Sequence, residues 1–246
     1  MGAAAAETLL ELGAAVTLVD RQAQAMRQRA ASLAQEQQGG GRVTALACDL
    51  ADERETREAI RRVIRSMGSL DILIHCAAFV GTTEMPGWGV AFEQQTVAAW
   101  DAALRVNLTS AFVMVQEARK ALERSGHGSV IFIASTYGLV GPDVRLYEGT
   151  TMANPAGYGA SKGGLLQLTR HLSTCLAPKI RVNAISPGGI VRGQPKPFQQ
   201  RYVARTPMGR MAVEEDLKGA VAYLASDLSA YVTGQNLVVD GGWTVW

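Results

Sequence analysis

The sequence predicts a single α/β domain built around a doubly wound parallel β-sheet. Short strand-like segments alternate with longer helix-like segments from one end of the chain to the other. Several strand segments are almost continuously apolar, which is typical of strands buried on both faces of a parallel sheet. Helices between such strands indicate right-handed βαβ units. No repeat or low-complexity linker interrupts the chain, so residues 1–246 are interpreted as one domain.

The predicted elements follow one another in a regular order. The predicted helices cover residues 2–12, 22–37, 53–67, 96–124, 157–176 and 213–226. The predicted strands cover residues 14–19, 42–47, 70–76, 129–134, 180–185 and 235–240. Two Gly- and Pro-rich connections, 135–156 and 186–212, are unusually long. Both follow strands, so we expect them at the carboxyl edge of the sheet, where α/β proteins bind ligands.

The composition excludes several classes of protein. Hydrophobic residues make up 48% of the chain, charged residues 19%, and the formal net charge is +2. This small charge argues against binding to nucleic acid or to an anionic membrane. No apolar stretch has the roughly 18 residues of a transmembrane helix, and no basic segment precedes the alanine-rich start. We therefore expect a cytoplasmic protein.

The cysteine and histidine residues form no recognisable motif. Cys48, Cys76 and Cys175 are far apart and odd in number. They indicate free thiols in a reducing compartment rather than disulfides or a zinc site. The histidines are also dispersed, so no metal site is predicted.

The strongest chemical signal is the segment YGASK, Tyr158 to Lys162. Residues four apart share one face of a helix, so the Lys162 ammonium can lie near the Tyr158 phenol. A nearby cation favours the phenolate and would lower the pKa of the phenol from about 10. Such a tyrosine can act as a general acid or base on a carbonyl or an alcohol. The alternative is an exposed pair on one helix, but only Tyr158 among six tyrosines has a lysine at this spacing.

Two further polar residues lie where they could assist. Ser135 follows the predicted strand 129–134, at the edge where the Tyr158 helix begins, and could hydrogen-bond a substrate oxygen. Asn107 interrupts an otherwise helical segment, and asparagine has a low helix propensity. Residues that do not fit their local secondary structure are often functional. A turn serine and a solvent-facing asparagine are the alternatives.

With these residues in place, the chain resembles a short-chain dehydrogenase/reductase of the classical type over almost its whole length. The family's catalytic Asn, Ser, Tyr and Lys match Asn107, Ser135, Tyr158 and Lys162 in the same order. Further motifs match at Asp49, at Pro187-Gly188 and at Gly234–Gly242. The resemblance implies a Rossmann-like fold and hydride transfer between a nicotinamide and a secondary alcohol or ketone. Tyr158 would exchange the proton, Ser135 would orient the substrate, Lys162 would hold the ribose, and Asn107 would position a water.

The resemblance also implies where a cofactor binds. The residues expected to contact it are Gly2, Asp20, Arg21, Asp49, Leu50, Ala77, Lys162, Pro187, Gly188 and Ile190. Asp20 ends a predicted strand, where its carboxylate can accept hydrogen bonds from ribose hydroxyls and would repel a 2′-phosphate. We therefore expect NAD rather than NADP, although Arg21 could offset part of that repulsion. Asp20 could also serve as a helix N-cap.

Two departures from the family pattern lie inside the chain. His75-Cys76-Ala77-Ala78 replaces the family's NNAG segment, and His75 is more simply explained as a core histidine. The interval between Ser135 and Tyr158 is longer than usual in the family, which predicts a lid or a substrate-binding elaboration. This segment resembles the subset linked to flagellin and surface-sugar modification, which favours a sugar derivative as substrate. Arg145, Glu148 and Thr151 could contact it, or could form ordinary loop salt bridges.

The third departure is the start of the chain. The family opens with a strand and a glycine-rich loop, and the spacing from Gly2 to Gly13 places Gly2 at the last glycine of that loop. The usual first strand is therefore expected to be absent from these residues, which would leave two strands without a bridging neighbour. Either the start is incomplete, or this is a degenerate member that binds NAD poorly, because the amides that cradle the pyrophosphate would be missing.

Two functions from different classes remain open. The first is an NAD(P)-dependent oxidoreductase, and the second is a non-catalytic relative that acts as a binding or scaffolding subunit. The resemblance further implies a homodimer or homotetramer in which the helices at 96–124 and 157–176 meet their copies.

Overall fold

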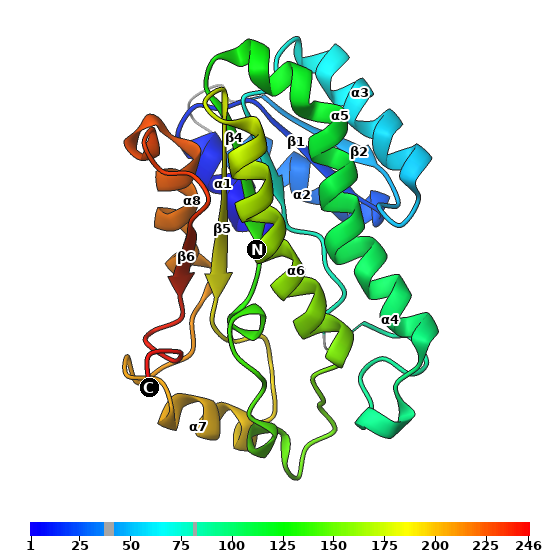
Figure 1. Ribbon diagram of the computed structural model, residues 1–246, viewed down its shortest axis with the longest axis vertical. Coiled ribbons are helices and arrows are strands. Elements are labelled where there is room, and N and C mark those ends of the chain that lie inside the picture. Colours follow the sequence, from blue (N-terminus) through cyan, green and yellow to red (C-terminus); the bar gives the residue numbers. More distant parts are fainter. Residues whose placement is uncertain (37–41, 81–82) are drawn as a thin grey trace.

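The computed structural model describes residues 1–36, 42–80 and 83–246. These residues form parallel strands covered by helices on both faces, which confirms the predicted Rossmann-like α/β fold (Figure 1). The strands are β1 (Val16–Asp20), β2 (Val43–Ala47), β3 (Ile72–His75), β4 (Gly128–Ile133), β5 (Ile180–Pro187) and β6 (Asn236–Val239). The α-helices are α1 (Gly2–Glu11), α2 (Ala23–Glu36), α3 (Glu53–Met67), α4 (Val97–Leu104), α5 (Ser110–Ser125), α6 (Ala156–Leu176), α7 (Lys196–Ala204) and α8 (Lys218–Ala225).

The hydrophobic core has a layer on each side of the strands. On one side, α3, α5 and α6 pack through residues such as Ile60, Leu122 and Leu165. On the other side, α1 and α8 pack through Leu9 and Leu224. Strand β4 is buried at all six positions, because both of its faces are covered. The continuous apolar run in the sequence reflects this double coverage.

Local signals explain several of the boundaries. Helix α3 begins where the Asp52 carboxylate accepts a hydrogen bond from the Glu55 backbone N–H at 2.8 Å. It ends at Gly68, whose φ of 81° suits a residue without a side chain. The predicted helix at 53–67 is therefore confirmed at both ends.

Two predicted segments are corrected by the structure, and a third reaches beyond the described residues. The region 186–212 was expected to be irregular, but it contains α7, whose buried Phe198 and Tyr202 pack among aromatic rings of distant segments. The predicted helix at 213–226 is a 3₁₀ turn, Glu214–Leu217, followed by α8. The predicted helix at 22–37 ends at Glu36 in α2, and residue 37 lies outside the described residues.

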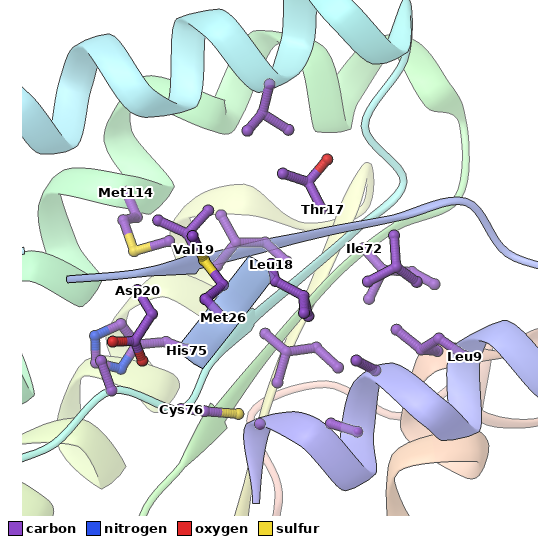
Figure 2. A pocket seen from close by; sticks show the side chains of 18 of the residues that line it. Leu9, Thr17, Leu18, Val19, Asp20, Met26, Ile72, His75, Cys76 and Met114 are labelled. Carbon is purple, nitrogen blue, oxygen red and sulfur yellow. The ribbon is translucent and has the colours of Figure 1, made fainter. Parts of the chain in front are cut away.

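The strands form two sheets instead of one. In the part of the chain that the structure describes, β1 pairs with β2, and a separate sheet has the order β3-β4-β5-β6. Among the described residues, β1 and β3 are therefore not paired with each other. A cavity of about 640 Å³ lies between β1 and β3, lined by both strands and by α1 (Figure 2). We refer to this cavity as the slot.

Candidate active site

The carboxyl ends of the strands bring most of the predicted site residues to one edge of the molecule. Asp20 ends β1, Asp49 follows β2, and Ala77 follows β3. Ser135 follows β4, and Pro187 ends β5. Because all these strands are parallel within their sheets, residues far apart in sequence share this edge. It is the edge at which open α/β folds bind ligands.

Tyr158 lies in the first turn of α6 and faces Ser135. Burial raises the pKa of the Tyr158 phenol above its usual value, and the Ser135 hydroxyl and the Arg192 charge partly counter that shift. The Ser135 hydroxyl also accepts a hydrogen bond from the Tyr137 backbone N–H at 3.2 Å, which fixes the turn after β4. The two side chains can therefore address the same substrate oxygen.

Lys162 lies one helical turn beyond Tyr158 and is only 2% exposed. Its Nζ is 5.7 Å from the centre of the Tyr158 ring and donates a hydrogen bond to the Ile133 carbonyl at 2.6 Å. Burial lowers the pKa of Lys162 to about 8, because the charged ammonium loses its contact with water. The ammonium is thus held at the carboxyl end of β4, beneath the tyrosine.

The expected electrostatic relation between these two residues is corrected in direction. The sequence predicts that Lys162 lowers the pKa of Tyr158, but the pKa of Tyr158 is raised. Burial of the phenol raises its pKa by more than the Ser135 hydrogen bond and the Arg192 charge lower it. Tyr158 therefore holds its proton at neutral pH, the state needed to donate one to a carbonyl oxygen.

Asn107 is fully buried at a break in the regular helix between α4 and α5. Residues Arg105–Thr109 form a π-helical turn, a feature that is frequent at functional sites. The Asn107 side chain accepts a hydrogen bond from the Phe79 backbone N–H at 2.6 Å and donates one to Ser161 Oγ at 2.9 Å. The solvent-facing alternative is therefore wrong. A water held by Asn107 stays a prediction.

Ser161 is a residue that the sequence reasoning missed. It lies within the YGASK segment. Its hydroxyl accepts a hydrogen bond from the Asn107 side-chain amide and donates one to the Tyr158 backbone carbonyl at 2.7 Å. This chain of hydrogen bonds connects the π-helical turn to the start of α6. The motif itself contained the signal, because a buried hydroxyl one residue before Lys162 needs a partner.

At the β1–β2 end of the edge, polar side chains surround an open hollow. Arg21, Asp49, Glu55 and Arg62 line it. Asp20, next to Arg21, is exposed. Its Oδ1 accepts a hydrogen bond from the Gln22 backbone N–H at 2.8 Å. Among the described contacts its Oδ2 has no partner, so this oxygen can accept a hydrogen bond from a hydroxyl. This carboxylate fits the ribose of an adenosine group. Leu50, also predicted to touch the cofactor, is buried in the core.

At the other end of the edge, the turn after β5 is tightly packed. A side chain at Gly188 would come within 2.9 Å of the Asp240 Cα, so only glycine fits there. The Gly189 backbone N–H donates to the Tyr202 hydroxyl at 2.5 Å, and Ile190 pairs with Ala212. Pro187, Gly188 and Ile190 thus present a fixed surface, and their contact with a cofactor stays a prediction.

The long segment between Ser135 and Tyr158 is folded onto α7. The Tyr137 and Tyr147 hydroxyls are hydrogen-bonded at 2.7 Å, and the Tyr147 ring lies 5.4 Å from that of Phe198. Arg145 forms a salt bridge with Asp143 at 2.8 Å, which confirms the alternative of an ordinary loop salt bridge for this residue. The Glu148 backbone carbonyl accepts a hydrogen bond from Arg201. The segment is therefore a structured cover next to Tyr158.

His75 is a core residue, as expected. Its Nε2 lies 2.7 Å from Ser110 Oγ, and burial lowers its pKa to about 3, so the ring is neutral. Its Nδ1 is buried and has no hydrogen-bond partner among the described residues. Gly2 lies nearby, where a side chain would be 3.6 Å from Cys76 Cβ. In the described residues no group of His, Cys, Asp and Glu could hold a metal ion, and no helix could span a bilayer.

Comparison with known proteins decides the family. A family model described as "Enoyl-(Acyl carrier protein) reductase" matches residues 1–244. The chain belongs to the short-chain dehydrogenase/reductase family. As a member of this family, it is an NAD(P)-dependent oxidoreductase, and the alternative of a non-catalytic subunit finds no support in its relatives.

Known proteins are similar to this chain over most of its length. Cis-4-hydroxycyclohexanecarboxylate dehydrogenase of Sinomonas cyclohexanicum is 33% identical and aligns with 99% of this chain and 92% of its own length. L-rhamnose 1-dehydrogenase (NAD(P)(+)) of Sphingomonas sp. (strain SKA58) is 31% identical over 82% of this chain and 76% of its own. The crystal structure of NADPH-dependent 3-quinuclidinone reductase from Rhodotorula rubra superposes with a TM-score of 0.85 at 29% identity, covering 99% of this chain and 86% of that one.

Proposed function

We propose that this oxidoreductase interconverts a secondary alcohol and a ketone, with Tyr158 as the general acid and base. The observation that carries this proposal is the convergence of Ser135, Tyr158 and Lys162 at the carboxyl edge, with Ser135 facing the phenol and Lys162 beneath its ring. When bound, the nicotinamide supplies or accepts the hydride. The chain's own residues position the substrate oxygen and move its proton.

In reduction, the Ser135 hydroxyl donates a hydrogen bond to the substrate carbonyl oxygen and orients it toward Tyr158. The protonated phenol then gives its proton to that oxygen as negative charge develops on it. The buried Lys162 ammonium stabilises the phenolate that remains, because a charge pair is strong where water is excluded. In oxidation the same phenolate removes the proton from the alcohol.

We propose NAD as the preferred cofactor. The Asp20 carboxylate supports this choice, because it can accept from the ribose hydroxyls and repels a 2′-phosphate. Arg21 and Arg62 line the adjoining hollow and offset part of that repulsion, so the preference is expected to be moderate.

We propose a cyclic polyol or sugar derivative as the substrate. The long interval between Ser135 and Tyr158 supports an elaborated substrate site, and among the relatives are an L-rhamnose dehydrogenase and a hydroxycyclohexanecarboxylate dehydrogenase. A role in modifying surface or flagellin sugars belongs to the same proposal. We further propose a cytoplasmic homodimer or homotetramer, which exposed side chains on α4 and α5, such as Trp100 and Phe112, support.

A substrate panel with both cofactors tests the function. Cyclic alcohols, aldoses and the corresponding ketones are incubated with NAD, NADP or their reduced forms, and nicotinamide absorbance is followed. Tyr158→Phe should lower kcat by about 1000-fold on any substrate that turns over. Tyr231→Phe is the matched control, because Tyr231 is fully exposed. A Tyr158→Phe protein that keeps wild-type kcat would overturn the mechanism.

A further inference from the structure

Two tyrosine hydroxyls are paired beside the candidate active site. Tyr137 lies in the 3₁₀ turn Thr136–Gly138, directly after Ser135, and Tyr147 ends a second 3₁₀ turn, Val144–Tyr147, in the cover. Their hydroxyl oxygens are 2.7 Å apart, and either one can be the donor. We refer to Tyr137 and Tyr147 as the phenol pair.

The phenol pair lies against the helix that carries the proposed catalytic tyrosine. The Tyr137 backbone oxygen is 3.3 Å from the place that a Cβ atom would take at Gly159, the neighbour of Tyr158. A Cβ atom at Gly138 would lie 2.7 Å from the Lys162 backbone carbonyl carbon, so only glycine permits this approach. The turn that carries Tyr137 is therefore packed directly on the part of α6 that contains the YGASK segment. Both members of the phenol pair also lie within electrostatic range of the Tyr158 phenol.

The phenol pair has one hydroxyl proton more than its own hydrogen bond uses. Each phenol supplies one O–H donor, and the bond between Tyr137 and Tyr147 uses one of the two. Among the described contacts the other proton has no acceptor. Burial raises the pKa of Tyr147 to about 12 and raises that of Tyr137 further, so both phenols keep their protons at neutral pH. Both side chains are only partly buried, so the second proton is available to water or to a bound molecule.

Aromatic packing holds both rings of the phenol pair in place. The Tyr137 ring meets Trp243 edge to face with the ring centres 6.2 Å apart, and the Tyr147 ring lies 5.4 Å from Phe198. Trp243 and Phe198 both stack on Tyr202 of α7. The hydroxyls are thus fixed before a substrate binds, which is the condition for a selective contact.

The charged groups near the phenol pair are already used within the cover. Asp143 forms salt bridges with Arg145 and Arg205, and Arg201 donates to the Glu148 backbone carbonyl. The available donor therefore belongs to a neutral hydroxyl. Such a donor suits a substrate hydroxyl, which can accept one hydrogen bond and return another. A carboxylate is bound more strongly by a charged fork such as arginine.

We propose that the phenol pair binds a second hydroxyl group of the substrate, while Ser135 and Tyr158 bind the oxygen on the reacting carbon. This inference rests on the proposed function, because it assigns another part of the same substrate. The enzyme then selects diols and polyols over mono-alcohols, since a mono-alcohol displaces water from the pair without replacing its hydrogen bond. Tyr137 and Tyr147 determine specificity and take no part in the proton transfer.

Substrates that differ by one hydroxyl group test the inference. Cyclohexanol is compared with the cyclohexanediols, and an aldose with its deoxy analogues. Values of kcat and KM are measured for the wild type, Tyr137→Phe and Tyr147→Phe. Each variant should lower kcat/KM for the hydroxyl-rich compound by about tenfold, mainly through KM, and should change it for the poorer partner by less than about twofold. A ratio of kcat/KM values that falls in neither variant would overturn the inference.

Tyr202→Phe is the matched control, because it removes a hydroxyl from the same aromatic cluster. The Tyr202 hydroxyl accepts a hydrogen bond from the Gly189 backbone N–H, so its loss should affect both members of a substrate pair equally. Tyr231→Phe, a change at an exposed tyrosine, should affect neither. If Tyr202→Phe lowers the ratio as much as Tyr147→Phe does, the effect comes from packing of the cluster and the inference is wrong. An effect seen only with a hydroxycyclohexanecarboxylate would equally exclude a hydroxyl as the group bound.

Binding measured without turnover separates this inference from the proposed function. Dissociation constants of the same compounds are obtained by ligand-observed NMR. The wild type should bind a cyclohexanediol about tenfold more tightly than cyclohexanol, and Tyr147→Phe should remove the difference. Equal binding of the two compounds by the wild type would overturn the inference whatever the catalytic result. A Tyr158→Phe protein that keeps wild-type kcat would overturn the proposed mechanism and leave this difference in binding unchanged.

Discussion

The two sheets of this protein differ in how completely their strands are buried. In the four-stranded sheet, β4 is buried at every position, and β5 at seven of its eight. In the two-stranded sheet, no residue of β1 or β2 is fully buried. The first sheet positions Ser135 and packs against the helix that carries Tyr158 and Lys162, whereas the second ends at Asp20 and Asp49. The proposed catalytic groups thus have a rigid base, and the proposed adenosine contacts have a looser one.

The largest difference is expected in local stability. Amides in β4 and β5 should exchange with solvent about 1000-fold more slowly than those in β1 and β2, because opening the buried sheet requires nearly global unfolding. Native-state hydrogen exchange measured by mass spectrometry checks this expectation. Equal protection of the two sheets would remove the contrast.

The second prediction concerns the unfolding free energy that is lost by burying the Lys162 ammonium. Lys162→Met should lower kcat by about 100-fold while stabilising the fold at neutral pH. Burial lowers the pKa of Lys162 to about 8 in the folded state, against about 10.4 unfolded. The unfolded state therefore binds more protons between these values, so wild-type stability rises with pH across that window.

Below pH 8 the burial of Lys162 lowers the unfolding free energy of the wild type by its full amount, about 3 kcal/mol from the shift in pKa. The advantage of Lys162→Met should be greatest there and should shrink as the pH approaches 10. Chemical denaturation of both proteins from pH 6 to 10 measures it, with Lys120→Met on α5 as the control. A methionine variant less stable than wild type at pH 7 would contradict the burial cost.

The third prediction concerns the π-helical turn, which is hydrogen-bonded through Asn107 to the start of α6. Asn107→Ala leaves the Phe79 backbone N–H and Ser161 Oγ without the partner they have now. Unfolding free energy should fall by about 2 kcal/mol, because unpaired buried groups keep their desolvation cost. Asn236→Ala, at a half-buried site on β6, should cost less. Equal losses would show that Asn107 has no special structural role.

The smallest effect is expected at the β1–β2 end. Asp20→Ala should raise kcat/KM with NADP relative to NAD by about tenfold, since about 1.4 kcal/mol of repulsion would be removed. Asp49→Ala serves as the control, because Asp49 lies past β2 instead of at the end of β1. An unchanged cofactor ratio would exclude Asp20 as the selecting residue.

The sequence was most informative where the signal is local. The apolar runs located the six described strands, and the predicted helix at 53–67 matches α3 at both ends. The YGASK spacing placed Tyr158 and Lys162 on one helical face, as observed. The segment 186–212 was predicted poorly, because α7 is stabilised by rings from distant segments, such as Tyr147 and Trp243, that no local window contains.

The candidate site shows the same limit. The mismatch of Asn107 with its helix was visible in the sequence, but its bond to Ser161 joins residues 54 positions apart. The direction of the Tyr158 pKa shift depended on how deeply the phenol is buried, which charge spacing cannot supply.

The sequence by itself therefore determined the order of the elements, the family and the residues that meet at the carboxyl edge. These follow from periodicity and from fixed spacings along the chain. Only the tertiary structure decided that the described strands form two sheets, that an apolar slot separates them, and that burial raises the pKa of Tyr158. The physical reason is that strand pairing and desolvation depend on neighbours in space, whereas periodicity records only which side of each element is covered.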